Sequence, residues 1–167
     1  MLSIQCTKKL GDYLKKDLQE KPHADQDLFY SWHSHLFVLN RKKYIVVMNS
    51  KTRYHFVLGP LLAKDLKGLD NMICVGIREN LAADGVTPNQ IEQYMEHAEV
   101  LRYMKTSQRA IIGQMNEAIL FINAWFENKG ILDLFMLNRK LNKFVMLKLP
   151  LTYSGRTMVK EMDNQYS

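Results

Sequence analysis

The sequence contains few cysteines and no long apolar run. Only Cys6 and Cys74 are present among 167 residues, and neither lies in a C-x-x-C pair, so a zinc knuckle or a dithiol redox motif is not indicated. Two isolated cysteines are typical of a reducing compartment. The longest apolar stretch, AILFINAWF, is too short to span a bilayer, and the N-terminus lacks the long apolar centre of a signal peptide. We therefore predict a soluble cytoplasmic protein without membrane contact.

The motifs of the well-marked enzyme classes are also missing. The sequence has no G-x-G-x-x-G, no Walker loop, no G-x-S-x-G and no H-E-x-x-H. It also has no acidic pair followed by a lysine on a strand, the pattern of a metal-dependent nuclease. These absences leave catalysis open but favour a protein that is not an enzyme and needs no cofactor.

The composition is that of a folded, basic domain. Apolar residues make up 47% of the chain, enough for a sizeable core, and the length suits a single domain over residues 1–167. Lysine and arginine number 23 against 17 acidic residues, which gives a formal charge of +6. This excess favours an anionic partner such as nucleic acid or an acidic protein, although an ordinary solvated basic surface has the same composition.

The hydrophobic pattern predicts an α+β fold. Three short runs rich in β-branched and aromatic residues, LFYSWHSHLFVLN, KYIVVMNS and RYHFVL, are separated by polar breaks and indicate a three-stranded antiparallel meander over about residues 28–58. Further strands are expected near both LSIQC and EVLRYMKT. We expect an antiparallel sheet built around the meander, with helices packed mainly on one face. Helices are predicted over residues 7–18, 59–85, 87–98, 107–130, 131–144 and around 156–162.

Pairing the strands of the meander separates two sheet faces. If the first turn closes symmetrically, Asn40 pairs with Lys43, and alternation assigns each side chain to a face. One face, which includes Trp32, is nearly all apolar and should bury against helices. The other face is apolar at one end. Its other end gathers His33, His35, Met48, Ser50, Arg53 and His55.

A transition-metal site is one hypothesis for this polar end. His33 and His35 lie about 7 Å apart along a strand and can converge on one ion. His55 is about 10 Å away at its Cα, near the limit of side-chain reach, and no carboxylate lies on this face. A metal-dependent hydrolase or nuclease that uses His33 and His35 is therefore an alternative function.

An anion-binding surface is the second hypothesis. His33, His35, Arg53 and His55 can meet phosphate with help from Lys8, Lys9 and Arg41, and interleaved aromatic residues suit base stacking. Arg109 is a further candidate, because an arginine in the first turn of a helix, capped by Thr106 or Ser107, often pairs with an anion. In the third interpretation the histidines are structural and hydrogen-bond beneath a covering segment.

We interpret the protein as a non-enzymatic binding or regulatory module. It contacts nucleic acid or another anionic partner through a basic surface that carries histidine and arginine. Besides the metal-dependent enzyme, a protein–protein interaction module that uses the aromatic part of the sheet face is an alternative, and self-association through such a patch belongs to it.

Several blocks of the sequence resemble a family of uncharacterised bacterial proteins known as a domain of unknown function. The blocks are QCTKKL, SWHSHLFVLNRKK, NSKTRYHFVL, KDLKGLDNMICVGIREN and KTSQRAIIGQMNE. The resemblance covers most of residues 1–125, whereas the helical part from about residue 130 is similar only loosely and is expected to diverge. It implies a small cytoplasmic bacterial protein associated with mobile elements. It supplies no activity, cofactor or catalytic residue.

Overall fold

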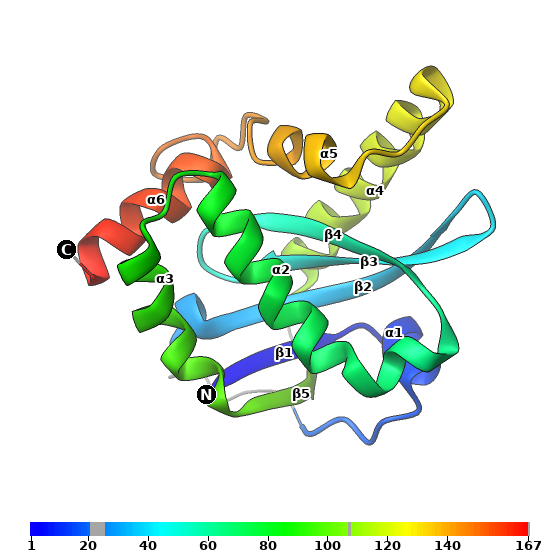
Figure 1. Ribbon diagram of the computed structural model, residues 1–167, viewed down its shortest axis with the longest axis horizontal. Coiled ribbons are helices and arrows are strands. Elements are labelled where there is room, and N and C mark those ends of the chain that lie inside the picture. The colour runs from blue at the N-terminus through cyan, green and yellow to red at the C-terminus, as the bar shows by residue number, and fades with distance from the viewer. Residues whose placement is uncertain (21–25, 107, 167) are drawn as a thin grey trace.

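The computed structural model describes residues 1–20, 26–106 and 108–166. A five-stranded sheet runs through the molecule in the order β4-β3-β2-β1-β5, and the chain ends in a helix at one edge of the fold (Figure 1). The strands are β1 (Leu2–Cys6), β2 (Ser31–Leu39), β3 (Lys42–Asn49), β4 (His55–Leu61) and β5 (Leu101–Lys105).

The sheet is mixed. The consecutive strands β2, β3 and β4 pair antiparallel, but β1 lies parallel to both β2 and β5. The predicted mixture of helices and strands is confirmed, and the prediction of an antiparallel sheet is wrong. The reason lies at the N-terminus, where a helix follows β1 and carries the chain back, so that β2 starts at the same end of the sheet as β1.

Helices and short 3₁₀ turns connect the strands. N-terminal capping explains where two of the helices begin. Thr7 accepts a hydrogen bond from the backbone N–H of Leu10, and Thr87 and Gln90 form a reciprocal capping box. The described helices are α1 (Lys8–Leu14), α2 (Leu69–Ala83), α3 (Pro88–Met95), α4 (Arg109–Lys129), α5 (Leu134–Leu141) and α6 (Ser154–Gln165). The 3₁₀ turns are η1 (Leu28–Tyr30), η2 (Ala63–Gly68) and η3 (Glu96–Glu99).

The long helix predicted over residues 59–85 is wrong at its start. Strand β4 continues through Pro60 to Leu61, and α2 begins only after η2. Gly59 has φ of 139°, and a Cβ at this position would lie 2.6 Å from the ring of Tyr44. Glycine therefore permits a bulged strand to pass close to β3, and the sequence Gly-Pro belongs to that bulge and not to a helix start.

Helices cover both faces of the sheet. One core contains Trp32 and Phe56 with the buried stripe of α2, and residues of α1, α3 and α6 join it. The second core contains Val46 and Val57 with buried residues of α4 and α5. The expectation of helices mainly on one face therefore needs correction, because the apolar end of the second face also requires cover and α4 and α5 supply it (Figure 1).

Candidate functional site

The predicted face of the histidines is the observed one. His33 is opposite Met48, and Met48 is opposite His55, so these three side chains lie in a row across β2, β3 and β4. His35 follows on the same face. The turn lies one residue earlier than expected, because Leu39 pairs with Lys42 where Asn40 was expected to pair with Lys43, and moving both partners by one residue leaves the faces unchanged.

Two of the three histidines lie inside the protein. His33 and His55 are 0% and 1% exposed, so neither forms part of the basic surface that the sequence predicted. Burial, together with the charge of Arg53, lowers the pKa of His33 to about 4. Burial also lowers the pKa of His55 to about 4. Both imidazoles are therefore neutral at physiological pH.

A buried polar network surrounds His33. Its Nδ1 lies 3.0 Å from the hydroxyl of Ser50, which donates in turn to Ser31. Because the Ser50 hydroxyl donates its proton to Ser31, it accepts the hydrogen bond from Nδ1 of His33. Gln5 also donates to Ser31, at 2.9 Å. These contacts connect β1, β2 and the β3–β4 turn, which is the structural interpretation that the sequence left open.

Arg53 and His35 lie at the border of this network. The Nε of Arg53 donates to Gln114 of α4 at 2.6 Å, and its Nη1 donates to the carbonyl of Ser50. His35 Nδ1 lies 2.7 Å from the hydroxyl of Thr7, and its pKa is lowered by burial and then by Lys9. Both side chains are half-buried and hydrogen-bonded, which leaves little of either for a partner.

The structure offers little to the hypothesis of a metal at His33 and His35. Within the part of the chain that the structure describes, no group of three histidine, cysteine or carboxylate side chains is placed to hold a metal ion. Each of the two histidines also uses its Nδ1 in a hydrogen bond within the protein. The Nε2 of His33 is buried and has no partner among the described residues.

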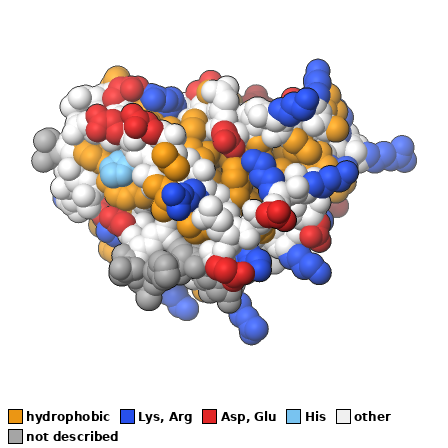
Figure 2. All heavy atoms as spheres, turned by 90° about the horizontal axis from the view of Figure 1, so that it is seen from below, with side chains coloured by type: hydrophobic (Ala, Val, Ile, Leu, Met, Phe, Trp, Pro, Cys, Tyr) orange, Lys and Arg blue, Asp and Glu red, His pale blue; other side chains and the backbone are white. Residues whose placement is uncertain are grey.

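The other predicted cations do not gather around the histidines. Lys8 and Lys9 are exposed on α1, Arg41 is exposed in the turn of the β2–β3 hairpin that projects from the sheet, and Arg109 is exposed in the first turn of α4. Gln108 and not Thr106 is the N-cap of α4, and Ser107 lies outside the described residues. On the face shown in Figure 2, Lys and Arg side chains are interspersed with Asp and Glu.

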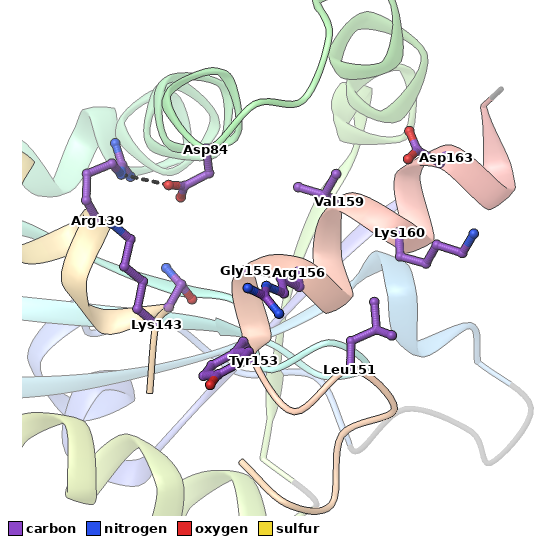
Figure 3. A pocket seen from close by; sticks show the side chains of 11 residues that line it. Asp84, Arg139, Lys143, Leu151, Tyr153, Gly155, Arg156, Val159, Lys160 and Asp163 are labelled. Atoms are coloured by element: carbon purple, nitrogen blue, oxygen red, sulfur yellow. Dashed lines mark ion pairs between the residues drawn. The ribbon is translucent and has the colours of Figure 1, made fainter. Parts of the chain in front are cut away.

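A basic hollow lies at the C-terminal end of the fold, where the sequence predicted no site. It encloses about 700 Å³ between the end of α5, the start of α6 and the C-cap of α2. Figure 3 shows Arg156 reaching from α6 toward α5, with the ring of Tyr153 beneath it. Its lining side chains are Asp84, Arg139, Asn142, Lys143, Leu151, Tyr153, Gly155, Arg156, Val159, Lys160 and Asp163.

One side of this basic hollow is already neutralised. Asp84 forms an ion pair with Arg139, whose Nε lies 3.0 Å from Asp84 Oδ1, and it accepts a hydrogen bond from Tyr54. Both partners of the ion pair are about one-sixth exposed. Burial raises the pKa of Asp84, while Tyr54, Arg139 and Lys143 act to lower it. Arg139 also donates to Asn80, so this group is a fixed wall of the hollow.

The remaining cations of the basic hollow are not in ion-pair contact with a carboxylate among the described residues, although Lys143 acts on Asp84 from a greater distance. Among the described residues, Lys143, Arg156 and Lys160 form no ion pair. Arg156 stacks on the ring of Tyr153, with 4.9 Å between its Cζ and the ring centroid. Asp163, the second carboxylate, accepts a hydrogen bond from Gln90. The hollow therefore presents positive charge and an aromatic ring to solvent.

A weak signal for this site was present in the sequence. Arg156 and Lys160 are four residues apart and so share a helix face, while Lys143 follows α5. These cations alone do not predict a site, because nothing local in the sequence shows that the end of α5 and the start of α6 meet. That meeting depends on contacts such as the hydrogen bond from the Gly155 backbone to Asn142.

Fold and hollow together define a mixed α+β domain with a basic concavity large enough for a small ligand. Over residues 3–155 the chain matches a family model described as Domain of unknown function (DUF6933), and it belongs to that family. The resemblance to a domain of unknown function is thereby confirmed, and the match runs past residue 130. The bacterial origin that the resemblance implied stays a prediction. No curated protein and no solved structure matches the chain. None of the described helices has the length and apolar character that a membrane crossing requires.

Proposed function

We propose that this protein is a non-enzymatic cytoplasmic module that binds nucleic acid or another anionic partner at the basic hollow. The observation that supports the proposal is the set of three cations, Lys143, Arg156 and Lys160, that line a concavity of about 700 Å³ and form no ion pair among the described residues. The hollow replaces the histidine-bearing surface as the candidate contact, because His33 and His55 are buried.

The physical basis is the focusing of charge in a concavity. Cations around a hollow with low-dielectric walls raise the local potential and attract an anion more strongly than the same cations on a flat surface. Arg156 is held in place by Tyr153, so less side-chain freedom is lost when it meets a phosphate or carboxylate. The net charge of +6 adds long-range attraction to the same partners.

Salt-dependent binding tests this function. Fluorescence anisotropy with a labelled single-stranded oligonucleotide of mixed sequence, and in parallel with polyglutamate, measures affinity over a range of salt concentrations. We expect at least one of the two polyanions to bind and its affinity to fall steeply with salt, because phosphate or carboxylate contacts release counterions. Absence of binding to both, or binding indifferent to salt, contradicts the proposal.

A charge-matched pair of variants locates the site. The triple variant Lys143→Gln, Arg156→Gln and Lys160→Gln should weaken binding by about ten-fold or more and reduce the slope of log affinity against log salt by about 2 for a single strand. The control removes the same charge from the positions that the sequence favoured, Lys8, Lys9 and Arg41, and should change affinity by about three-fold or less through net charge alone. Equal losses in the two variants would place binding outside the hollow.

A further inference from the structure

Exposed apolar side chains are concentrated in one part of the chain. Eight of the fourteen large hydrophobic residues that are exposed in the described structure lie within residues 120–151. Leu147 is 87% exposed and Ile131 is 74% exposed. Single exposed hydrophobic residues are ordinary, but a gathering on adjacent elements indicates a surface that another molecule covers.

Part of this apolar surface is concave. A cavity of about 230 Å³ lies between α4 and the segment that follows α5, lined by Phe121 on one side and by Phe144 and Val145 on the other, and it reaches the buried His55. The rings of Phe121 and Phe144 meet edge to face with centroids 4.5 Å apart, and Trp125 continues the row at 5.9 Å from Phe121. We call this surface the aromatic groove. A concave apolar surface suits an inserted side chain better than a flat contact does.

Two cations lie at the Trp125 end of the aromatic groove. Lys129 and Lys140 lie over the ring of Trp125, with 5.7 Å and 5.4 Å from their Nζ atoms to the ring centroid. Neither lysine forms an ion pair among the described residues, whereas the cavity wall itself carries Glu117, four residues before Phe121 on α4. A second copy of the chain would bring the same cations to the contact, and like charges repel across an interface. The two lysines therefore favour an occupant whose carboxylates lie at the Trp125 end of the groove.

We propose that the aromatic groove docks an acidic amphipathic helix of a partner protein. One apolar side chain of that helix enters the cavity that Phe121, Phe144 and Val145 line, and its carboxylates meet Lys129 and Lys140. This is the helix-in-groove mode of recognition, in which anchors spaced three and four residues apart supply affinity and rim charges supply specificity. The site is separate from the basic hollow and does not depend on the function proposed for it.

The experiment uses a designed peptide and the full-length protein. The probe is a labelled helical peptide of about 18 residues with leucine and phenylalanine at i, i+3, i+4 and i+7 and glutamate on the opposite face. A scrambled peptide of the same composition has no apolar face. We expect the helical peptide to bind, to quench or shift Trp125 fluorescence, and to lose affinity with added salt. The scrambled peptide should bind at least about ten-fold more weakly.

Surface variants locate the contact without disturbing the core. Leu147→Glu should weaken peptide binding by about ten-fold, whereas Leu62→Glu, a change at a residue 57% exposed before η2, should leave it unchanged. Lys129→Gln with Lys140→Gln should weaken binding more than Lys64→Gln with Lys67→Gln, which removes equal charge elsewhere. Circular dichroism checks that each variant is folded.

Three outcomes overturn the inference. The first is no binding of the helical peptide, or equal binding of the scrambled one. The second is binding to anionic lipid vesicles that Leu147→Glu abolishes while the peptide does not bind, which assigns the surface to a membrane. The third is a concentration-dependent dimer in light scattering that Leu147→Glu dissociates, which assigns it to a second copy. Oligonucleotide binding by the Leu147→Glu variant tests the basic hollow independently.

Discussion

The imidazoles of His33 and His55 are buried and remain neutral, although histidine often ionises near physiological pH. His33 keeps a hydrogen bond to Ser50, and His55 Nδ1 lies 2.8 Å from the carbonyl of Arg53. A buried neutral imidazole with one partner costs far less than a buried charge, which explains why both can lie beneath α4 and α5. At the scale of single residues, these histidines therefore affect the protein through their lowered proton affinity.

Stability should fall in mild acid because of these two residues. The pKa of each is about 4 in the folded protein against about 6.5 in the unfolded chain. Between those values the unfolded state binds more protons, so the free energy of unfolding decreases as the pH falls from about 6.5 toward 4, by up to about 1.4 kcal/mol per pH unit for each histidine. Above pH 6.5 their contribution is constant.

Urea unfolding at several pH values between about 7.5 and 5 measures this effect, since most carboxylates titrate lower. Asparagine offers an amide near the position of Nδ1 and does not titrate. His33→Asn and His55→Asn should each remove a comparable part of the slope in this window, and the double variant most of it, while His35, whose pKa is also lowered by burial, supplies the remainder. An unchanged slope in the double variant contradicts the assignment.

At the scale of elements, α5 completes the hydrogen bonding of β4, one of the two edge strands of the sheet. Asn138 accepts from the backbone N–H of Val57 and donates to its carbonyl, at 2.8 and 3.2 Å. Asn142, one helical turn later, does the same for His55 at 2.9 and 2.7 Å. Two side-chain amides thus act as a substitute strand along β4, which protects an edge that is otherwise open to pairing with other chains.

Asn142→Ala should destabilise the protein by about 2–3 kcal/mol, because it leaves both backbone groups of His55 buried without partners. Asn142→Asp should also destabilise it, since an aspartate oxygen would face the carbonyl of His55. Thermal and urea denaturation measure both variants. The control is Asn116→Ala on the exposed side of α4, which should change stability by less than about 0.5 kcal/mol. Equal effects at positions 142 and 116 would exclude the bridging role.

The elements that follow from local pattern could be predicted, and those that depend on distant contacts could not. Alternation placed His33 and His55 on one face and Trp32 on the other, because a side-chain period of two is a property of any strand. The parallel position of β1 depends on where α1 returns the chain, and nothing in LSIQC reports it. The basic hollow was missed for the same reason: Lys143 and Arg156 are separated in sequence and meet only because α5 and α6 pack together.

At the scale of the whole molecule, one sheet serves two cores. Because side chains alternate, every central strand contributes to both: on β3, Ile45 and Val47 belong to the core beneath α2, and Val46 and Met48 to the core beneath α4. If β3 leaves the sheet, apolar side chains of both cores become exposed to water. The single domain predicted over residues 1–167 is therefore expected to unfold as one unit, even though its proposed sites lie on C-terminal helices.

The two tryptophans allow a test of this cooperativity, because each reports on a different core. Trp32 is fully buried in the first core, and Trp125 packs against the second. With excitation selective for tryptophan, the fluorescence of Trp125→Phe reports on the first core and that of Trp32→Phe on the second. Within each variant, the urea midpoint from fluorescence should coincide with that from far-ultraviolet circular dichroism, whatever the stability of the variant. If the Trp125 signal of Trp32→Phe changes at a lower urea concentration than its helical signal, then α4 and α5 form a separate unit, and the shared sheet does not couple the two cores.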